Sequence, residues 1–170
     1  SQKVLDAMDK GTTIEQIYEA TRLLKKNGIK PAFFLQFGYL GEKKEDIEKT
    51  INMLLDLMPE EIGISVSYPL PGTKFYDKVK EQLKEKTNWT DSDELALMYK
   101  GTFSPLYYKK LHRYVHKVYR RKQSLMNLKN VFLNPFNVNR KKLRSALSSL
   151  YYVPASIAES IVLKKLETAK

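Results

Sequence analysis

Apolar residues along the first half of the chain fall at alternating helical and strand spacings. They recur every three or four residues over 14–24 and 45–57, which predicts two helices that each bury one face. Residues 32–37 are almost continuously apolar, which predicts a strand buried on both faces. Residues 62–67 predict a second short strand and 74–84 a third helix. Helices that alternate with strands over short connections are typical of a parallel sheet.

Polar and proline motifs mark where these elements end. Thr12 or Thr13 is expected to cap the first helix, which Asn27-Gly28 then ends. Two strands are too few for a stable sheet. The sheet must therefore gain strands from elsewhere or form the end of a longer barrel. Its open edges predict weak cooperativity or self-association.

From residue 87 the pattern predicts helices alone. A long helix is expected over 106–126, followed by a break at Asn134-Pro135 and two helices over 140–151 and 154–166, the last beginning at Pro154. The predicted apolar face of the long helix consists of Tyr107, Leu111, Val115, Val118, Leu125 and Met126. We therefore expect two regions, an α/β part over 1–86 and a helical extension over 87–170.

Charge separates the same two regions. Residues 1–100 carry 15 Lys or Arg and 17 Asp or Glu, whereas residues 101–170 carry 15 and 2, so the whole basic excess lies in the second part. The absence of cysteine excludes disulfides, a thiolate nucleophile and thiolate ligands for zinc or an iron–sulfur cluster within this chain. No apolar run approaches about 20 residues and no signal peptide is visible, so we expect a cytoplasmic protein without a membrane span.

Two strand ends carry the candidate chemistry, QFGYLGE at 36–42 and SYPLPGT at 67–73. Ligands of α/β sheets bind at the edge where parallel strands give way to helices. Glycines allow positive φ or a close backbone approach, and the two prolines hold an exposed loop in one shape. Such a loop could present backbone groups to a flat polar ligand such as adenine. Ordinary turn chemistry would explain the same residues without a ligand.

Five segments in register resemble one known family. VLDAMDKGTT, FFLQFGYLGE, SVSYPLPGTKFY, TNWTDSDELALMYKGTFS and LHRYVH occur in this order, across residues 1–121. Together they resemble the C-terminal half of radical S-adenosylmethionine (SAM) enzymes with an N-terminal cobalamin-binding domain, in particular the subgroup around the anaerobic magnesium-protoporphyrin ester cyclases. The resemblance implies an α/β fold, a partial radical SAM (β/α)6 barrel with residues 32–37 as its fifth strand and 62–67 as its sixth, followed by an α-helical C-terminal extension.

The resemblance also implies which residues bind the cofactor. Ser1 and Gln2 correspond to the end of the fourth-strand motif near SAM, and Lys10 to a basic position that can pair with the SAM carboxylate. The fifth-strand end that packs on the nucleoside corresponds to Gln36, Phe37 and Gly38. The sixth-strand loop that contacts adenine through its backbone corresponds to Tyr68, Pro69, Leu70, Pro71, Gly72 and Thr73.

The chain departs from the family in two ways that shape the functional expectation. The family holds a [4Fe–4S] cluster on a CxxxCxxC motif, which this cysteine-free chain lacks, as it lacks the cobalamin domain. Leu40 replaces a usual proline and Lys43 a frequent threonine. We expect part of the SAM pocket of an enzyme that cleaves SAM reductively for methyl transfer or cyclisation of an organic substrate. The cluster ligands, the cobalamin domain and the rest of the barrel would then lie outside this chain, which alone would be inactive.

The basic helix leaves other functions open. His112 and His116, four residues apart, could hold zinc, but Arg113 stands where zinc proteases have glutamate and lysines surround the pair. The segment YYKKLHRYVHKVYRRK could bind nucleic acid, lie on an anionic membrane or pack its apolar face on the barrel. Packing is favoured first and the membrane surface second. The competing functional class is a non-enzymatic basic module that binds anionic membrane or nucleic acid.

Overall fold

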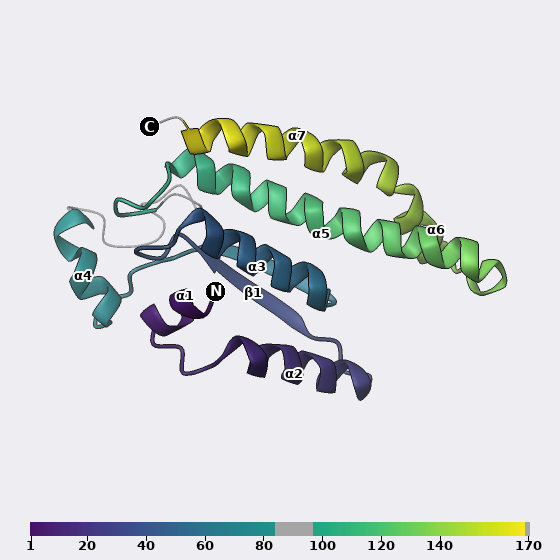
Figure 1. The fold of residues 1–170 in the computed structure, drawn as a ribbon, viewed down its shortest axis with the longest axis horizontal. Coiled ribbons are helices and arrows are strands. Elements are labelled where there is room, and N and C mark those ends of the chain that lie inside the picture. The colour runs from purple at the N-terminus through teal and green to yellow at the C-terminus, as the bar shows by residue number, and fades with distance from the viewer. Residues whose placement is uncertain (84–96, 169–170) are drawn as a thin grey trace. The chain divides into compact units, whose positions relative to one another are not determined.

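The structure is a computed structural model that describes residues 1–83 and 97–168 (Figure 1), and its first half alternates helices with strands as predicted. The chain divides into two units, Ser1–Lys109 and Lys110–Lys170, and each is described by itself. The elements of the first unit are α1 (Gln2–Ala7), α2 (Ile14–Lys26), β1 (Ala32–Phe37), α3 (Lys44–Leu57), β2 (Glu61–Val66) and α4 (Lys74–Leu83). The predicted region boundary at 86/87 lies outside the described residues.

β1 and β2 form a two-stranded parallel sheet, so the predicted pairing is confirmed. Ala32 lies opposite Glu61 and Phe37 opposite Val66, and β2 begins one residue earlier than predicted. The parallel register brings the C-terminal ends of both strands to the same edge. The fold is therefore mixed α/β and mostly helical, with both predicted ligand-binding motifs at one edge of the sheet.

The prediction that β1 is buried on both faces is wrong. Leu35 and Phe37 point to the covered face and are buried, whereas Phe34 points to the opposite face and is 91% exposed. A Cβ at Gly63, the partner of Phe34 in the sheet, would lie 2.8 Å from the Phe34 ring, so the aromatic side chain occupies the space above that glycine. This face is therefore open to solvent at Phe34, and an apolar run typical of a buried strand is partly exposed.

The predicted helix boundaries follow from local hydrogen bonding. Thr13 is the N-cap of α2, where its hydroxyl accepts from the Gln16 N–H and the Gln16 side chain accepts from the Thr13 N–H, so the capping box is confirmed. Asn27 ends this helix. α3 ends at Met58, which takes the left-handed conformation with φ 41° ahead of Pro59.

The second half of the chain is helical, as predicted, but with different boundaries. α5 (Pro105–Leu133) is followed by the short 3₁₀ helix η2 (Pro135–Asn137), α6 (Arg140–Leu147) and α7 (Ser149–Thr168). α5 runs seven residues beyond its predicted end, up to the Asn134-Pro135 break. The prediction that Pro154 begins the last helix is wrong, because the break lies at Ser148 and Pro154 lies inside α7. Because proline has no N–H, the Leu150 carbonyl has no backbone donor four residues later, yet α7 continues through Pro154.

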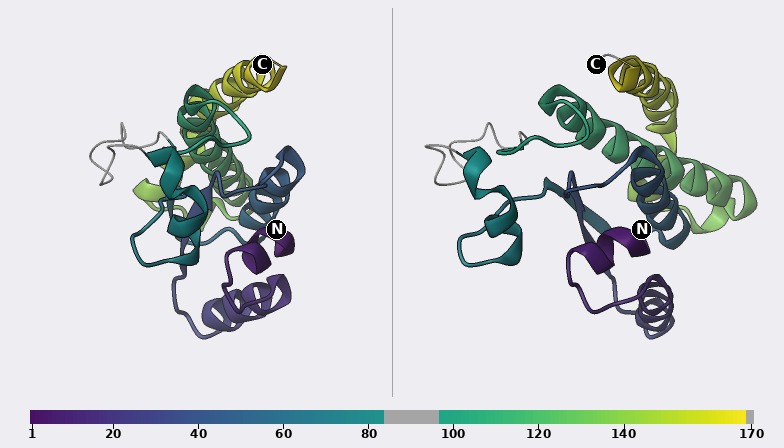
Figure 2. Two further views of the ribbon diagram at one scale, coloured as in Figure 1. Left: turned by 90° about the vertical axis from the view of Figure 1, so that its left-hand side faces the viewer. Right: turned by 60° about the vertical axis from the view of Figure 1, so that its left-hand side comes forward.

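Polar contacts join α5 to the returning helices within the second unit. The Lys117 ammonium lies 2.7 Å from the Glu159 carboxylate, and Arg121 donates to the Ser156 hydroxyl at 3.1 Å. Asn127 donates to the hydroxyl of Ser145 at 2.8 Å. Figures 1 and 2 show α7 running back alongside α5, with α6 at the connecting end. Of the predicted apolar face of α5, Leu125 and Met126 are exposed, contrary to expectation.

The expectation that nothing is apolar enough to span a membrane also needs correction. The helical stretch Arg140–Thr168 is long and apolar enough by length and composition, because scattered serines interrupt the apolar run without making it hydrophilic. Only 28% of its most apolar window is buried. One such helix is weak evidence for a membrane span, since core helices of soluble proteins pass the same test.

Candidate functional site

The turn after β1 is held by three hydrogen bonds, two of which come from residues about 60 positions further along the sequence. The Gly38 N–H donates to the Glu42 carboxylate at 2.5 Å, and the Gly38 carbonyl accepts from the Tyr99 hydroxyl at 2.5 Å. Thr102 donates to the Glu42 carbonyl at 2.6 Å. Gly38 has φ +84°, and a Cβ there would lie 2.8 Å from the Leu97 side chain. A glycine is therefore required both by the backbone conformation and by the space.

Glu42 is a buried carboxyl group at the base of this turn. Its side chain is 1% exposed, and burial raises its pKa to about 7, while the hydrogen bond from Gly38 opposes the rise. Nearby Asp46 raises this pKa further and Lys3 lowers it. The group therefore changes charge near neutral pH while it holds the backbone of the β1 turn.

Asp46 fixes the start of α3 and ties it to α1. Although burial opposes ionisation, the Ser1 hydroxyl at 2.7 Å and the Lys43 N–H at 3.0 Å hold the pKa of Asp46 at about 2. The Lys3 ammonium, 3.0 Å away, contributes in the same direction. Ser1 thus contacts the helix that follows the β1 turn, through a carboxylate that stays charged at all ordinary pH values.

The loop after β2 is shaped by Thr73. Its hydroxyl donates to the Leu70 carbonyl at 2.7 Å and accepts from the Tyr76 N–H at 3.1 Å, so it closes the PLPGT turn and caps α4. Gly72 has φ +82° with nothing within 4 Å of a Cβ built there, so the conformation alone requires glycine. The loop is thus rigid in its own right.

A pocket of about 420 Å³ joins the two strand ends to the end of α1. It brings together five of the predicted site residues, Lys10, Gln36, Tyr68, Leu70 and Thr73. Its other lining residues are Ala7, Met8, Asp9, Tyr39, Lys74, Phe75 and Lys78. The volume lies in the range of small-molecule sites. A larger hollow of about 590 Å³ lies on α2 alone and includes no predicted site residue.

A second pocket of about 170 Å³ is lined by residues of α1, α2, α3 and β1. Ser1, Lys10 and Gln36 line it together with Phe34 and the buried Glu42. Lys10 and Gln36 therefore lie on the rim shared by both pockets, one from the end of α1 and one from the end of β1. Six of the twelve predicted residues thus line one or both of these pockets.

The other predicted residues lie outside both pockets. The Gln2 side-chain amide donates to Asp6 and accepts from the Ile14 N–H, so it ties α1 to the start of α2. Phe37 is 1% exposed and points away from Gln36, as strand alternation requires. Gly38 is held in the turn described above. The remaining three, which shape the loop after β2 without lining the pocket, are Pro69, Pro71 and Gly72.

Several lining residues were not predicted from the sequence. Tyr39 packs against Phe75 in a tilted arrangement with ring centroids 4.7 Å apart, and both rings line the pocket. Phe75 also meets the buried Tyr99 edge-on at 5.2 Å. Burial raises the pKa of the Tyr99 hydroxyl above its ordinary value. Tyr39 also donates to the Ala7 carbonyl at 2.8 Å, which anchors the end of α1.

The pocket is also more basic than expected. Lys74 and Lys78 lie one helical turn apart on α4 and line the same pocket as Lys10, against the single carboxylate of Asp9. Lys74 pairs with Asp9 at 2.9 Å. The two lysines four residues apart, directly after PLPGT, are a signal for this basic lining in the sequence itself. Such a lining suits a ligand that carries a carboxylate or another anionic group.

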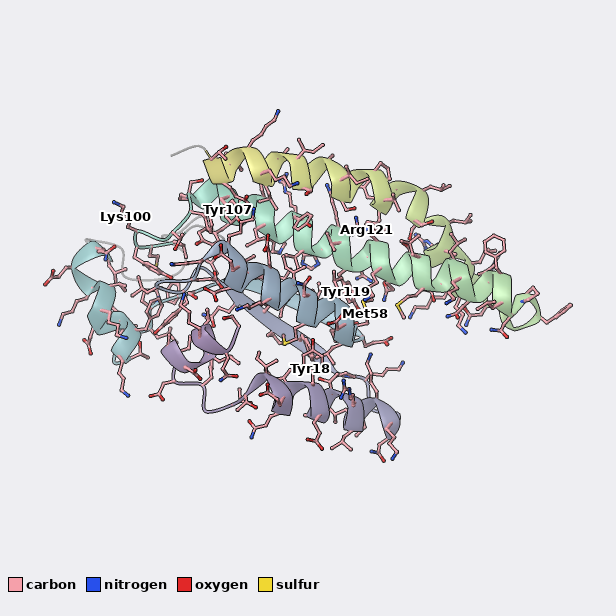
Figure 3. All side chains as sticks on the ribbon, viewed as in Figure 1. Tyr18, Met58, Lys100, Tyr107, Tyr119 and Arg121 are labelled. Atoms are coloured by element: carbon pink, nitrogen blue, oxygen red, sulfur yellow. The ribbon has the colours of Figure 1, made fainter. Side chains whose placement is uncertain are left out.

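The basic helix places its two histidines on one face, as predicted. The His112 and His116 ring centroids are 4.7 Å apart. Burial lowers the pKa of both groups, and Arg113 adds to this for His112. Within residues 1–83 and 97–168, no group of three or more His, Cys, Asp or Glu side chains could hold a metal ion. Figure 3 labels Tyr107 and Arg121 on the same helix.

The lining of the pocket is chemically compatible with the carboxylate and the adenine ring of SAM, whereas the chain has no thiolate ligand for an iron–sulfur cluster. The pocket offers a lysine for a carboxylate, aromatic side chains and a rigid backbone loop for a flat ring, all at the edge of a parallel sheet where nucleotides bind. A cluster needs thiolate ligands, and the 170 residues include no cysteine. Any cluster must be held by residues outside this chain.

Comparisons with known proteins give three partial matches. The chain is 31% identical over 86 residues, 51% of its length, to a provisionally named methylthiotransferase of Methanocaldococcus jannaschii. It is 31% identical over 84 residues, 49% of its length, to the anaerobic magnesium-protoporphyrin IX monomethyl ester cyclase of Cereibacter sphaeroides. It is 27% identical over 90 residues, 52% of its length, to an uncharacterized methyltransferase of Pyrococcus horikoshii.

These matches cover a small part of each relative. The aligned residues span 19%, 14% and 20% of the three proteins respectively. No protein-family model matches the chain. All three relatives carry names of the radical SAM type, so about half of this chain is distantly similar to enzymes of that kind.

Proposed function

We propose that this chain is part of a radical SAM enzyme and supplies the C-terminal part of its SAM pocket. The observation that carries the proposal is the convergence of Lys10, Gln36 and the Tyr68–Thr73 loop on one pocket at the C-terminal edge of two parallel strands. The distant similarity to three enzymes with names of the radical SAM type supports the same reading.

Each part of the pocket has a chemical task in this proposal. Lys10 pairs with the carboxylate of SAM, and its exposure at the end of α1 leaves the ammonium free to turn toward a ligand. Gln36 contacts the nucleoside from the strand end. The loop closed by Thr73 offers its backbone to the adenine edge. SAM itself supplies a methyl group or, once cleaved reductively, a 5′-deoxyadenosyl radical.

The proposal assigns partners to the surfaces that this chain leaves open. The exposed face of β1 around Phe34 would be covered by the remaining strands of a barrel, whose N-terminal part would also carry the cluster ligands and a cobalamin domain. The substrate is an organic molecule that undergoes methyl transfer or cyclisation. The protein would act in the cytoplasm.

The first test reads the coding sequence upstream of Ser1. The proposal expects the frame to continue into a CxxxCxxC motif. A start codon directly before Ser1 would contradict the single-chain form of the proposal and leave the cluster to a partner subunit.

The second test measures amide hydrogen exchange with S-adenosylhomocysteine and with SAM, in the cluster-containing protein. The amides of Tyr68, Leu70, Gly72 and Thr73 should gain protection, and Lys10→Ala should weaken binding about tenfold, the loss expected for one charge-assisted contact. Lys26→Ala, which removes an equally exposed lysine from α2, is the matched control and should bind normally. Unchanged exchange at saturating ligand would contradict the assigned pocket.

A further inference from the structure

α6 and α7 present an apolar stripe to solvent and a partly polar face to α5. The exposed stripe consists of Leu143, Leu147, Leu150, Ile157 and Ile161, which are 45%, 59%, 80%, 51% and 52% exposed. Their spacings of four, three, seven and four residues place them on one side of the helical stretch. A surface helix ordinarily buries such a stripe.

The residues on the opposite side are buried although several are polar. Ser149, Ser156 and Glu159 are 6%, 1% and 8% exposed. Ser156 and Glu159 bind Arg121 and Lys117 of α5, as described above (Figure 3 labels Arg121). Hydrogen bonds and an ion pair therefore fix which face of α7 meets α5, and the apolar side is left outward. Ala146 and Leu163 are buried as well, at 1% and 4% exposed, so the helices are apolar on the outward side and mixed on the buried side.

More exposed apolar side chains lie at the connection between α5 and α6. Phe132, Leu133 and Phe136 are 77%, 64% and 101% exposed. Exposed apolar patches on this scale usually mark an interaction site. We call the stripe and the exposed apolar residues of the connection together the α6–α7 surface and define it by these eight residues.

The charge around this surface points to an anionic partner. Between Gly101 and Ala158 the chain carries twelve Lys or Arg and no Asp or Glu. Arg140, Lys141 and Arg144 lie at the start of the stripe, and Lys164 and Lys165 lie at its end. An apolar helix face bordered by cations is the pattern of helices that lie in the interface of an anionic bilayer.

We propose that the α6–α7 surface docks onto an anionic lipid bilayer, lying in the plane of the interface. If Arg140–Thr168 spanned the membrane, Glu159 would lie in the bilayer interior. It would either lose its ion pair with Lys117 or draw Lys117 into the bilayer with it. Both outcomes place a charged side chain in the bilayer at a high free-energy cost. The interfacial placement keeps the ion pair on the protein side. This inference is independent of the SAM pocket.

The test is sedimentation of the chain with vesicles of phosphatidylcholine containing 30% phosphatidylserine, and with phosphatidylcholine alone. Binding should require phosphatidylserine and weaken with salt.

Leu150→Asp with Ile157→Asp should reduce the affinity for these vesicles by at least about tenfold, because two inserted apolar groups are lost. Arg140→Gln with Lys141→Gln should reduce it about fivefold per charge removed. The control, Leu23→Asp with Ile29→Asp, alters two apolar residues of the first unit that are 51% and 54% exposed, and it should bind normally.

A second readout reports insertion directly. The chain contains no cysteine, so Ile157→Cys and Leu23→Cys each create a single site for an environment-sensitive fluorophore. The label at 157 should shift to the blue on vesicles and the label at 23 should not. This readout reports where residue 157 lies in the bound protein without a comparison of the affinities of two variants.

Four outcomes would overturn the proposal. The first is absence of vesicle binding, and the second is binding that the Asp variants leave unchanged. The third is equal binding to neutral vesicles that resists alkaline extraction, which would indicate a spanning helix. The fourth is displacement of the chain from vesicles by duplex DNA with the label at 157 unshifted, which would assign the cations to nucleic acid.

Discussion

The Tyr99 hydroxyl donates to the Gly38 carbonyl at 2.5 Å, across 61 residues of sequence. This contact and the Glu42 hydrogen bond hold the C=O and the N–H of Gly38, in the two peptide units on either side of its Cα, at the end of β1. The segment after α4 is thereby tied to the strand end that carries Gln36. The site depends on residues far from the motifs that mark it.

Tyr99→Phe should destabilise the first unit by about 1–3 kcal/mol, because a buried carbonyl loses its partner. Denaturant unfolding measures the effect. Tyr151→Phe removes a hydroxyl from a side chain that is 60% exposed and should change stability by less than about 0.5 kcal/mol. Equal effects of the two changes would show that the Gly38 contact carries no stability.

Glu42 should make stability fall as pH rises toward neutrality. The folded carboxyl holds its proton up to about pH 7, whereas the unfolded one releases it near 4.5. The folded state therefore binds more protons between these values, and the free energy of unfolding should decrease by up to about 3 kcal/mol across that window.

Glu42→Gln should abolish this slope, since the amide oxygen can still accept from Gly38 but cannot ionise. In denaturant midpoint, the variant should match the parent below about pH 4.5 and exceed it near pH 8. Glu19→Gln, on the exposed surface of α2, should retain the parent slope. A Glu42→Gln variant with an unaltered pH dependence would contradict the assigned role.

Phe34 should drive self-association of the chain. An exposed aromatic ring on an open sheet face, next to unpaired strand edges, is a typical aggregation site. Phe34→Ser should shift the sedimentation distribution toward monomer. Phe136→Ser, which removes an equally exposed phenylalanine from the second unit, serves as control. If only the control restores monomer, association proceeds through the second unit.

The Lys117–Glu159 pair should show strong coupling. The two side chains are 24% and 10% exposed, so removal of one partner leaves a poorly solvated charge. Lys117→Met alone should destabilise by about 3 kcal/mol, and adding Glu159→Leu should recover most of the loss. A double-mutant cycle by denaturant unfolding measures this, and additive losses would argue against a direct pair.

Periodicity and local capping were enough to predict most elements of the first unit. The spacing in 14–24, the Thr13 capping box and the glycines and prolines at strand ends act through neighbouring residues, so the sequence by itself determined both strands, their parallel pairing and the motif loops. The i, i+4 lysines on α4 could have been predicted in the same way.

Tertiary structure alone decided which of these residues meet. Lys10 reaches the shared rim because Tyr39 anchors the end of α1, and Gly38 is held by Glu42 and Tyr99, contacts that no local pattern encodes. Tertiary structure likewise determines which apolar residues are buried. The sequence pattern marks residues 32–37 and α7 as apolar, but only their neighbours determine that Phe34 and Leu150 face outward. Apolar spacing predicts which side chains share one face of an element, whereas the element that covers this face depends on the whole fold.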